Sequence, residues 1–195
     1  MTRTDLFVHT LAAGLLLAVA ILSGACTRYT PKPRAYFRID LKEKDYRYSD
    51  SSRVCYFEYP HNIARVVPQK EHPDWFDIVY PTYNARIYCS YMPLTGNLYE
   101  VSEDSRDFVY KHTVKADAIT QQPYEDPEHR MYGILYDIQG NPASSVQFVL
   151  TDSVRHFLRG SLYFNNKPNK DSLAPVINYL RDDIIHLMET ARWNP

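Results

Sequence analysis

Glycine is scarce in this sequence, with 6 residues in a chain of 195. Loops that cradle phosphate groups, such as the P-loop and the dinucleotide-binding fingerprint, need several glycines at fixed spacings. Neither pattern occurs, and the nucleophile elbow G-x-S-x-G and the zinc-binding helix H-E-x-x-H are missing too. We therefore expect no enzyme, no cofactor and no metal site.

A surplus of charge of one sign is also missing, because 22 basic and 23 acidic residues leave a net charge of −1. This balance gives no reason to expect nucleic acid as a partner. Long apolar runs are missing as well. The longest, Leu11–Leu22, falls short of the roughly 20 residues that a bilayer-spanning helix needs. Its length is typical of the core of a signal peptide.

The first residues have the order of a lipoprotein export signal. The apolar run is followed by the small residues 23–25 and then by Cys26. Lipoprotein signal peptidase cleaves before such a cysteine, whose thiol then carries diacylglycerol while the new amino terminus carries an acyl chain such as palmitate. The alternative is ordinary secretion with a coincidental cysteine. We expect a signal peptide over 1–25, a lipidated tether containing two prolines over 26–40, and one globular domain over 41–195.

Cysteine is rare, and only Cys55 and Cys89 remain beyond Cys26. Export places them in a compartment that permits disulfides, and both lie in strand-like runs that could bring them within bridging distance. A disulfide and two buried free thiols both stay open. Tyrosine, by contrast, is frequent, with 17 residues against 8 phenylalanines. That excess is typical of β-sheet, and also of a surface rich in interfaces.

Apolar spacing predicts an α+β domain in which two amphipathic helices cover an antiparallel sheet. One helix is expected over 98–118, capped by Asn97 and carrying His112 as a core histidine on its apolar stripe. A second helix follows Asp171 or Ser172, with Pro175 in its first turn. Strands are expected over residues 53–59, 75–80, 85–92, 130–137, 145–151 and 156–164.

The last two strands form a hairpin whose register follows from its apolar face. A three-residue loop over 153–155 pairs Leu150 with Leu158 and keeps the apolar side chains together. The other face then carries four polar residues, which form either a partner-binding surface or an ordinary solvated face: Gln147, Arg159, Ser161 and Tyr163. Asp152, Ser153 and His156 meet in the turn, where we expect turn stabilisation rather than catalysis.

Several long runs of the sequence occur in one order that is typical of a known family. They are Pro31–Tyr36, Phe57–Pro60, Tyr110–Ile119, Gly140–Phe148, Thr151–Gly160, Leu162–Asn165 and Asp171–Val176, with Trp193. On these runs nearly the whole mature chain resembles the GldD family of Bacteroidota. The order of elements also resembles the Mog1/PsbP arrangement.

The GldD resemblance implies a cell-envelope lipoprotein of gliding motility and of the associated type IX secretion apparatus. It implies subunits of that apparatus as partners, with no catalytic residues and no cofactor. We therefore expect a non-enzymatic accessory or scaffold subunit, with a periplasmic lipid- or cell-wall-fragment-binding protein as the alternative. Thr27 after the cysteine favours the outer membrane, on its periplasmic face.

Overall fold

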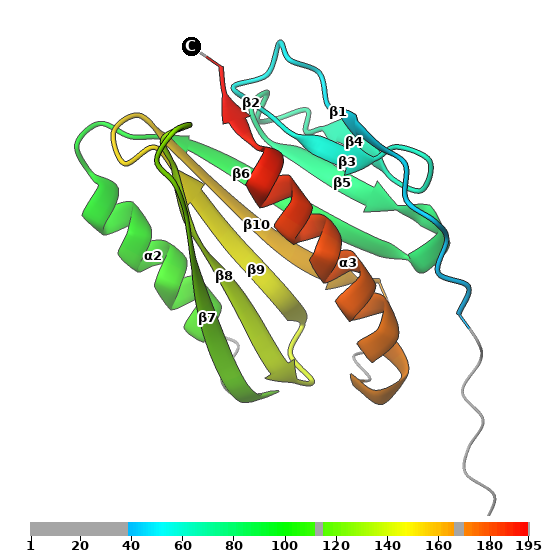
Figure 1. Cartoon of the computed structure of the whole chain (residues 1–195). Helices are drawn as coiled ribbons and strands as arrows, with labels where there is room; N and C mark the ends of the chain where they lie inside the picture. The colour runs from blue at the N-terminus through cyan, green and yellow to red at the C-terminus, as the bar shows by residue number, and fades with distance from the viewer. Residues whose placement is uncertain (1–38, 112–114, 166–169, 195) are drawn as a thin grey trace, which may run out of the picture. The chain divides into compact units, whose positions relative to one another are not determined.

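Seven antiparallel strands form the main sheet of the chain. The computed structural model describes residues 39–111, 115–165 and 170–194 (Figure 1). In spatial order the strands are β4 (Arg65–Pro68), β5 (Phe76–Tyr80), β6 (Ala85–Pro93), β10 (His156–Phe164), β9 (Ser144–Thr151), β8 (Met131–Gly140) and β7 (Ala116–Asp126). Two small sheets pair β1 (Tyr46–Tyr48) with β3 (Glu58–Pro60), and β2 (Cys55–Tyr56) with β11 (Arg192–Trp193).

The two long helices cover opposite faces of this sheet, because successive side chains of a strand point to opposite sides. Helix α3 (Lys170–Thr190) buries Leu180 and Ile184 in one apolar cluster with Phe148 and Leu158 of the sheet. Helix α2 (Leu98–Tyr110) packs on the other face, in a second cluster that contains Tyr136, Val149 and Phe157. The predicted α+β class with two covering helices is confirmed; the Mog1/PsbP likeness stays a prediction.

The predicted first helix is too long, because α2 ends at Tyr110. Ala116 and Ile119 continue the helical spacing, but they belong to β7, which pairs with β8 over ten residue pairs and a register shift. Both side chains pack against the same apolar cluster as α2. The apolar spacing therefore reflected a core that the helix and the strand share, and not a single continuous helix. Asn97 occupies the N-cap without a side-chain capping bond. His112 lies outside the described residues.

The hairpin of β9 and β10 has the predicted register from Phe157 to Ser161, with Leu150 opposite Leu158 and Gln147 opposite Ser161. A bulge follows, so that Tyr163 lies opposite Ser144. Helix α3 begins at Lys170, before the predicted start, so Pro175 lies inside it and not in the first turn. The short strands β1, β4 and β11 lacked a sequence signal.

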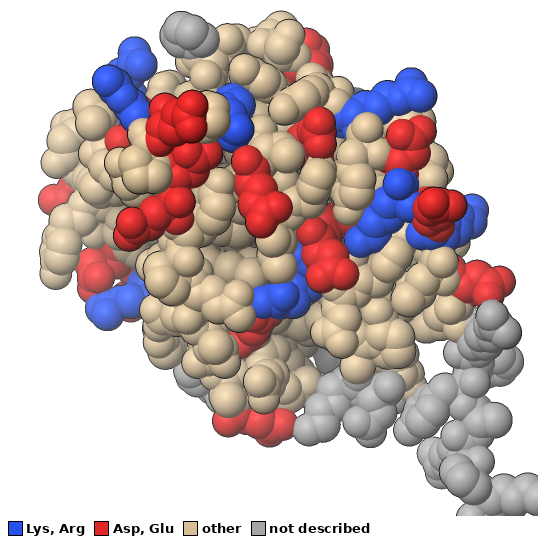
Figure 2. Space-filling model, in the orientation of Figure 1, with Lys and Arg blue, Asp and Glu red and all other residues tan. Residues whose placement is uncertain are grey.

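Charged side chains of both signs are interspersed on the face of the molecule drawn in Figure 2. This agrees with the balanced composition, since 22 basic and 23 acidic residues nearly cancel. Among the described residues, no helix combines the length and the apolar character that crossing a bilayer requires.

Candidate functional site

Among the described residues, no helix covers one half of the α2-side face of the sheet. The strand register places three rows of side chains there, across β4, β5, β6 and β10. We call this set the open face: Arg65, Val67, Asp77, Val79, Arg86, Tyr88, Ser90, Arg159, Ser161 and Tyr163. Most of these side chains are exposed or half-buried, in contrast to the apolar half of the same face beneath α2.

A hollow of about 280 Å³ lies on the open face where it meets α2. Its lining residues are Tyr88, Ser90, Phe108, Arg159, Ser161 and Tyr163. The guanidinium carbon of Arg159 lies 4.6 Å from the centre of the Phe108 ring, a cation–π contact. Partial burial lowers the pKa of Arg159, although Tyr163 and Asp104 act in the opposite direction. Arginine stays protonated in proteins, so this hollow holds a positive charge.

No carboxylate among the described residues lies within ion-pair distance of Arg159. The other arginine on β6 or β10 of the open face, Arg86, lies 2.7 Å from Asp77. Asp77 also accepts a hydrogen bond of 2.9 Å from Gln69, so both of its oxygens are occupied. Arg159 is therefore the one of the two without a direct ion pair, although the charge of Asp104 acts on it from a longer distance.

A second hollow of about 450 Å³ lies beside the first, and Tyr88 and Tyr163 line both. The two rings meet edge to face, with centroids 5.5 Å apart. The side chain of Tyr88 is 43% exposed, a large value for an aromatic residue in the middle of a sheet. The two hollows are thus neighbours that share this aromatic pair.

Three of the four residues predicted for a partner-binding surface line the first hollow: Arg159, Ser161 and Tyr163. Gln147 is 1% exposed and lies behind Ser161, whose hydroxyl donates a hydrogen bond of 3.3 Å to its side-chain oxygen. Among the described residues, the amide nitrogen of Gln147 has no hydrogen-bond partner. That these residues bind a partner stays a prediction.

Sequence reasoning missed Tyr88, Ser90 and Phe108 as neighbours of Arg159. The alternation in residues 85–92 does place Tyr88 and Ser90 on one side of a strand. The pairing of β6 with β10, however, joins segments about 70 residues apart, and local spacing carries no signal for such a pairing.

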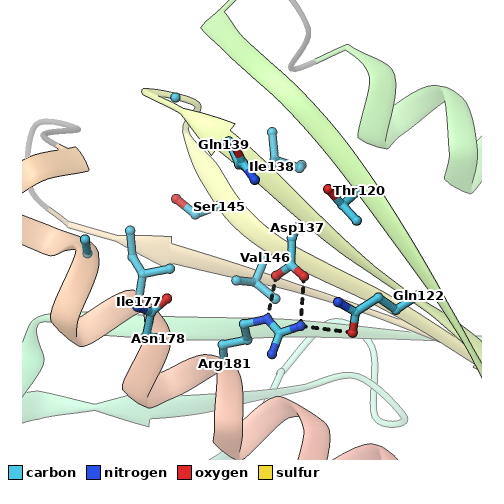
Figure 3. Close-up of a pocket in the computed structure, with 12 residues that line it drawn as sticks. Thr120, Gln122, Asp137, Ile138, Gln139, Ser145, Val146, Ile177, Asn178 and Arg181 are labelled. Carbon is cyan, nitrogen blue, oxygen red and sulfur yellow. Dashed lines mark hydrogen bonds and ion pairs between the residues drawn. The ribbon is translucent and has the colours of Figure 1, made fainter.

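A third hollow, of about 420 Å³, lies between α3 and the strands β7 and β8 (Figure 3). Arg181 of α3 points into it and donates hydrogen bonds of 2.7 and 2.9 Å to the two oxygens of Asp137. A further bond of 3.0 Å runs from Arg181 to the side-chain oxygen of Gln122. The bonds to Asp137 raise the pKa of Arg181. Its charge is balanced within the fold, unlike that of Arg159.

The turn between β9 and β10 has the geometry of a stabilised turn. One oxygen of Asp152 accepts backbone N–H bonds from Val154, Arg155 and His156, at 3.0, 2.7 and 2.8 Å. The ring of His156 contacts the hydroxyl of Tyr91 at 2.9 Å. Asp152 is therefore engaged by the backbone. Within the described ranges, no group of three His, Cys, Asp or Glu residues could hold a metal ion.

Cys55 and Cys89 are both buried free thiols in the structure. This corresponds to the second of the two alternatives left open by the sequence. Burial raises the pKa of Cys55 to about 12 and that of Cys89 well above its ordinary value. Cys26 lies outside the described residues.

These features define an α+β domain with an open aromatic and basic face. A family model described as the gliding motility lipoprotein GldD matches residues 26–193, and the chain belongs to that family. It is therefore a membrane-anchored lipoprotein of the cell envelope that is associated with gliding motility. No curated protein matches the sequence.

Proposed function

We propose that this protein is a non-enzymatic accessory or scaffold subunit of the gliding and type IX secretion machinery, and that the open face docks a protein partner. The observation that carries the docking proposal is the exposed Tyr88 beside Arg159, an arginine without a direct ion pair to a described residue. Tyrosine and arginine are the side chains most often found to dominate interface energetics. Membership of the gliding motility family supports the cellular process.

The same proposal places the protein on the periplasmic face of the outer membrane, held by lipid on Cys26. The family match begins at Cys26, which supports this residue as the start of the mature chain. A signal peptide over 1–25 and a tether over 26–40 complete the arrangement. Together they would hold the domain close to membrane-embedded partners without a spanning helix.

An assembly role is favoured over storage or transport of a lipid or cell-wall fragment. A small-molecule site is expected to be a deep, mostly apolar cavity that buries most of its ligand. The two hollows of the open face are instead open to solvent, share the Tyr88–Tyr163 pair, and are lined in part by Arg86, Arg159 and hydroxyl groups. Such a surface suits the flat contact of a protein interface.

The proposal is tested by Tyr88→Ala in the native host, with Tyr48→Ala as the matched control. Tyr48 is 55% exposed and makes a similar edge contact, with Tyr56, outside the open face. We expect Tyr88→Ala to abolish or strongly reduce gliding and secretion of a type IX substrate, with an unchanged melting temperature. Tyr48→Ala should leave both processes intact.

A Tyr88→Ala strain that glides and secretes like the wild type would contradict docking through the open face. A deletion strain that loses gliding but secretes normally would contradict the secretion part of the proposal. The first result concerns docking through the open face, and the second concerns the role in secretion, so the two parts of the proposal are tested independently.

A further inference from the structure

We propose that the hollow around Arg159 is a carboxylate-binding site, and that it takes the side chain of an aspartate or glutamate in an extended acidic segment of a partner protein. This inference rests on the proposed docking function and names the chemistry of the partner. It concerns the hollow of Tyr88, Ser90, Phe108, Arg159, Ser161 and Tyr163.

Arg159 is half-buried and has no direct ion pair to a described residue. Arg159 is half-buried against Phe108, with its guanidinium carbon 4.6 Å from the ring centre, and it makes no hydrogen bond to any described residue. Burying a charge without a counter-charge is costly, and protein arginines in such positions are usually paired. Arg181, whose side chain is 22% exposed, follows that rule through Asp137, and the more exposed Arg86 pairs with the buried Asp77. A carboxylate supplied by a partner would give Arg159 the same kind of counter-charge.

Further hydrogen-bond donors line the hollow around Arg159. The hydroxyls of Ser90 and Tyr163 line the hollow and make no hydrogen bond to a described residue. A guanidinium offers two parallel N–H groups to one carboxylate, and the two hydroxyls can donate to its remaining lone pairs. The hollow of about 280 Å³ has room for one acidic side chain.

The strands of the open face carry more basic than acidic side chains. Arg65, Arg86 and Arg159 share the open face with the carboxylate of Asp77, which is already bound by Arg86 and Gln69. The strand residues of the open face therefore carry a net positive charge, with Asp104 of α2 near Arg159, although the whole chain carries a net charge of −1. Complementary charge sets the choice of partner and the rate of association.

The geometry favours a peptide over an acidic sugar. Sugar hydroxyls need acceptors, and the open face carries one carboxylate, Asp77, whose oxygens are taken. Tyr88 and Tyr163 meet at an interplanar angle of 76°, so they do not form the flat platform on which a sugar ring stacks. An extended segment crossing the strands can place one acidic side chain in the hollow and apolar groups against Val79 and the tyrosines.

The test uses the full-length lipoprotein in detergent micelles and three probes: hexaglutamate, hexaglutamine and hexagalacturonate. We expect hexaglutamate to bind and hexaglutamine not to bind, with an affinity that falls as salt rises. Arg159→Ala should weaken hexaglutamate binding about tenfold or more, the loss of charged hydrogen bonds. Arg159→Lys should recover only part of it, because lysine keeps the charge but not the paired donors.

Arg47→Ala is the matched control, because its side chain is 69% exposed and lies outside the open face. It should bind hexaglutamate like the wild type. Binding that is equal in the wild type and in both Arg159 variants would overturn the inference, as would a preference for hexagalacturonate. Should Arg159→Ala fail to fold, the lysine variant decides alone. If Tyr88→Ala abolishes gliding while hexaglutamate binds equally well with and without Arg159, the open face would be supported as the docking surface. That combination would reject an acidic segment as its partner.

Discussion

Asp183 of α3 ties the first described segment of the chain to the core. The side chain is 1% exposed, and one of its oxygens accepts a hydrogen bond of 2.6 Å from the hydroxyl of Tyr46. The ammonium group of Lys44 lies 2.7 Å from the same oxygen and also donates to the carbonyl oxygen of Tyr179 at 2.7 Å. Burial raises the pKa of Asp183, and the bonds from Lys44 and Tyr46 oppose that rise. The segment that leads into β1 is thus held through a buried ion pair.

Asp183→Ala is expected to lower the free energy of unfolding by about 3–5 kcal/mol, because it leaves the ammonium group of Lys44 without its counter-charge. Asp182 is the matched control, since it is the exposed neighbour on the same helix turn. Asp182→Ala should change stability by no more than about 0.5 kcal/mol. Urea denaturation of the three proteins measures both effects, and equal stabilities of the two variants would contradict a structural role for Asp183.

The hairpin of β9 and β10 depends on its turn for register. Asp152 accepts three backbone N–H bonds there, and the next residue, Ser153, has a positive φ of 65°. Partial burial acts to raise the pKa of Asp152, but the three backbone bonds outweigh it and the pKa is lowered. A carboxylate with a lowered pKa in the folded state stabilises the protein above its ordinary pKa of 3.8. That stability is lost as the pH falls through the folded pKa.

Asp152→Ala should therefore cost about 1 kcal/mol near neutral pH, where the wild-type carboxylate is ionised and fully bonded. The difference between wild type and variant should shrink as the pH is lowered from about 6 to about 2.5. Asp152→Asn is the control, because its side-chain oxygen keeps an acceptor but cannot titrate. Unfolding measured across this range would contradict the argument if the difference between wild type and Asp152→Ala grew in acid.

Membrane attachment is predicted to lie at Cys26, which is outside the described residues. The family is one of lipoproteins. Each buried acyl methylene contributes about 0.8 kcal/mol, and several chains anchor a protein far more firmly than one. The whole attachment is therefore predicted to depend on the modification of Cys26.

Cys26→Ser should abolish lipid labelling and move the protein from the membrane fraction to the soluble fraction. Cys55→Ala is the control, because it removes a buried thiol and keeps Cys26. A Cys26→Ser protein that stayed on the membrane after a high-salt wash would contradict the lipid anchor. Digestion of the domain by protease added to intact cells would place it on the cell surface and not on the periplasmic face.

Local patterns were enough to predict the α+β class and the C-terminal helix with its apolar stripe. They also predicted the hairpin register that pairs Leu150 with Leu158 and Gln147 with Ser161. Each depends on side-chain periodicity or on a short loop, and both act over a few residues. The four-residue set of Gln147, Arg159, Ser161 and Tyr163 was found in the same way, because alternation places it on one face.

Tertiary packing decided the rest. Ala116 and Ile119 follow helical spacing, yet pairing with β8 makes their segment a strand. Gln147 and Arg159 share one face, yet Gln147 is buried and Arg159 is half-buried beside Phe108. Tyr88 reaches the hollow only because β6 pairs with β10. Long-range strand pairing and helix docking depend on the total apolar area buried, which no short window of sequence contains.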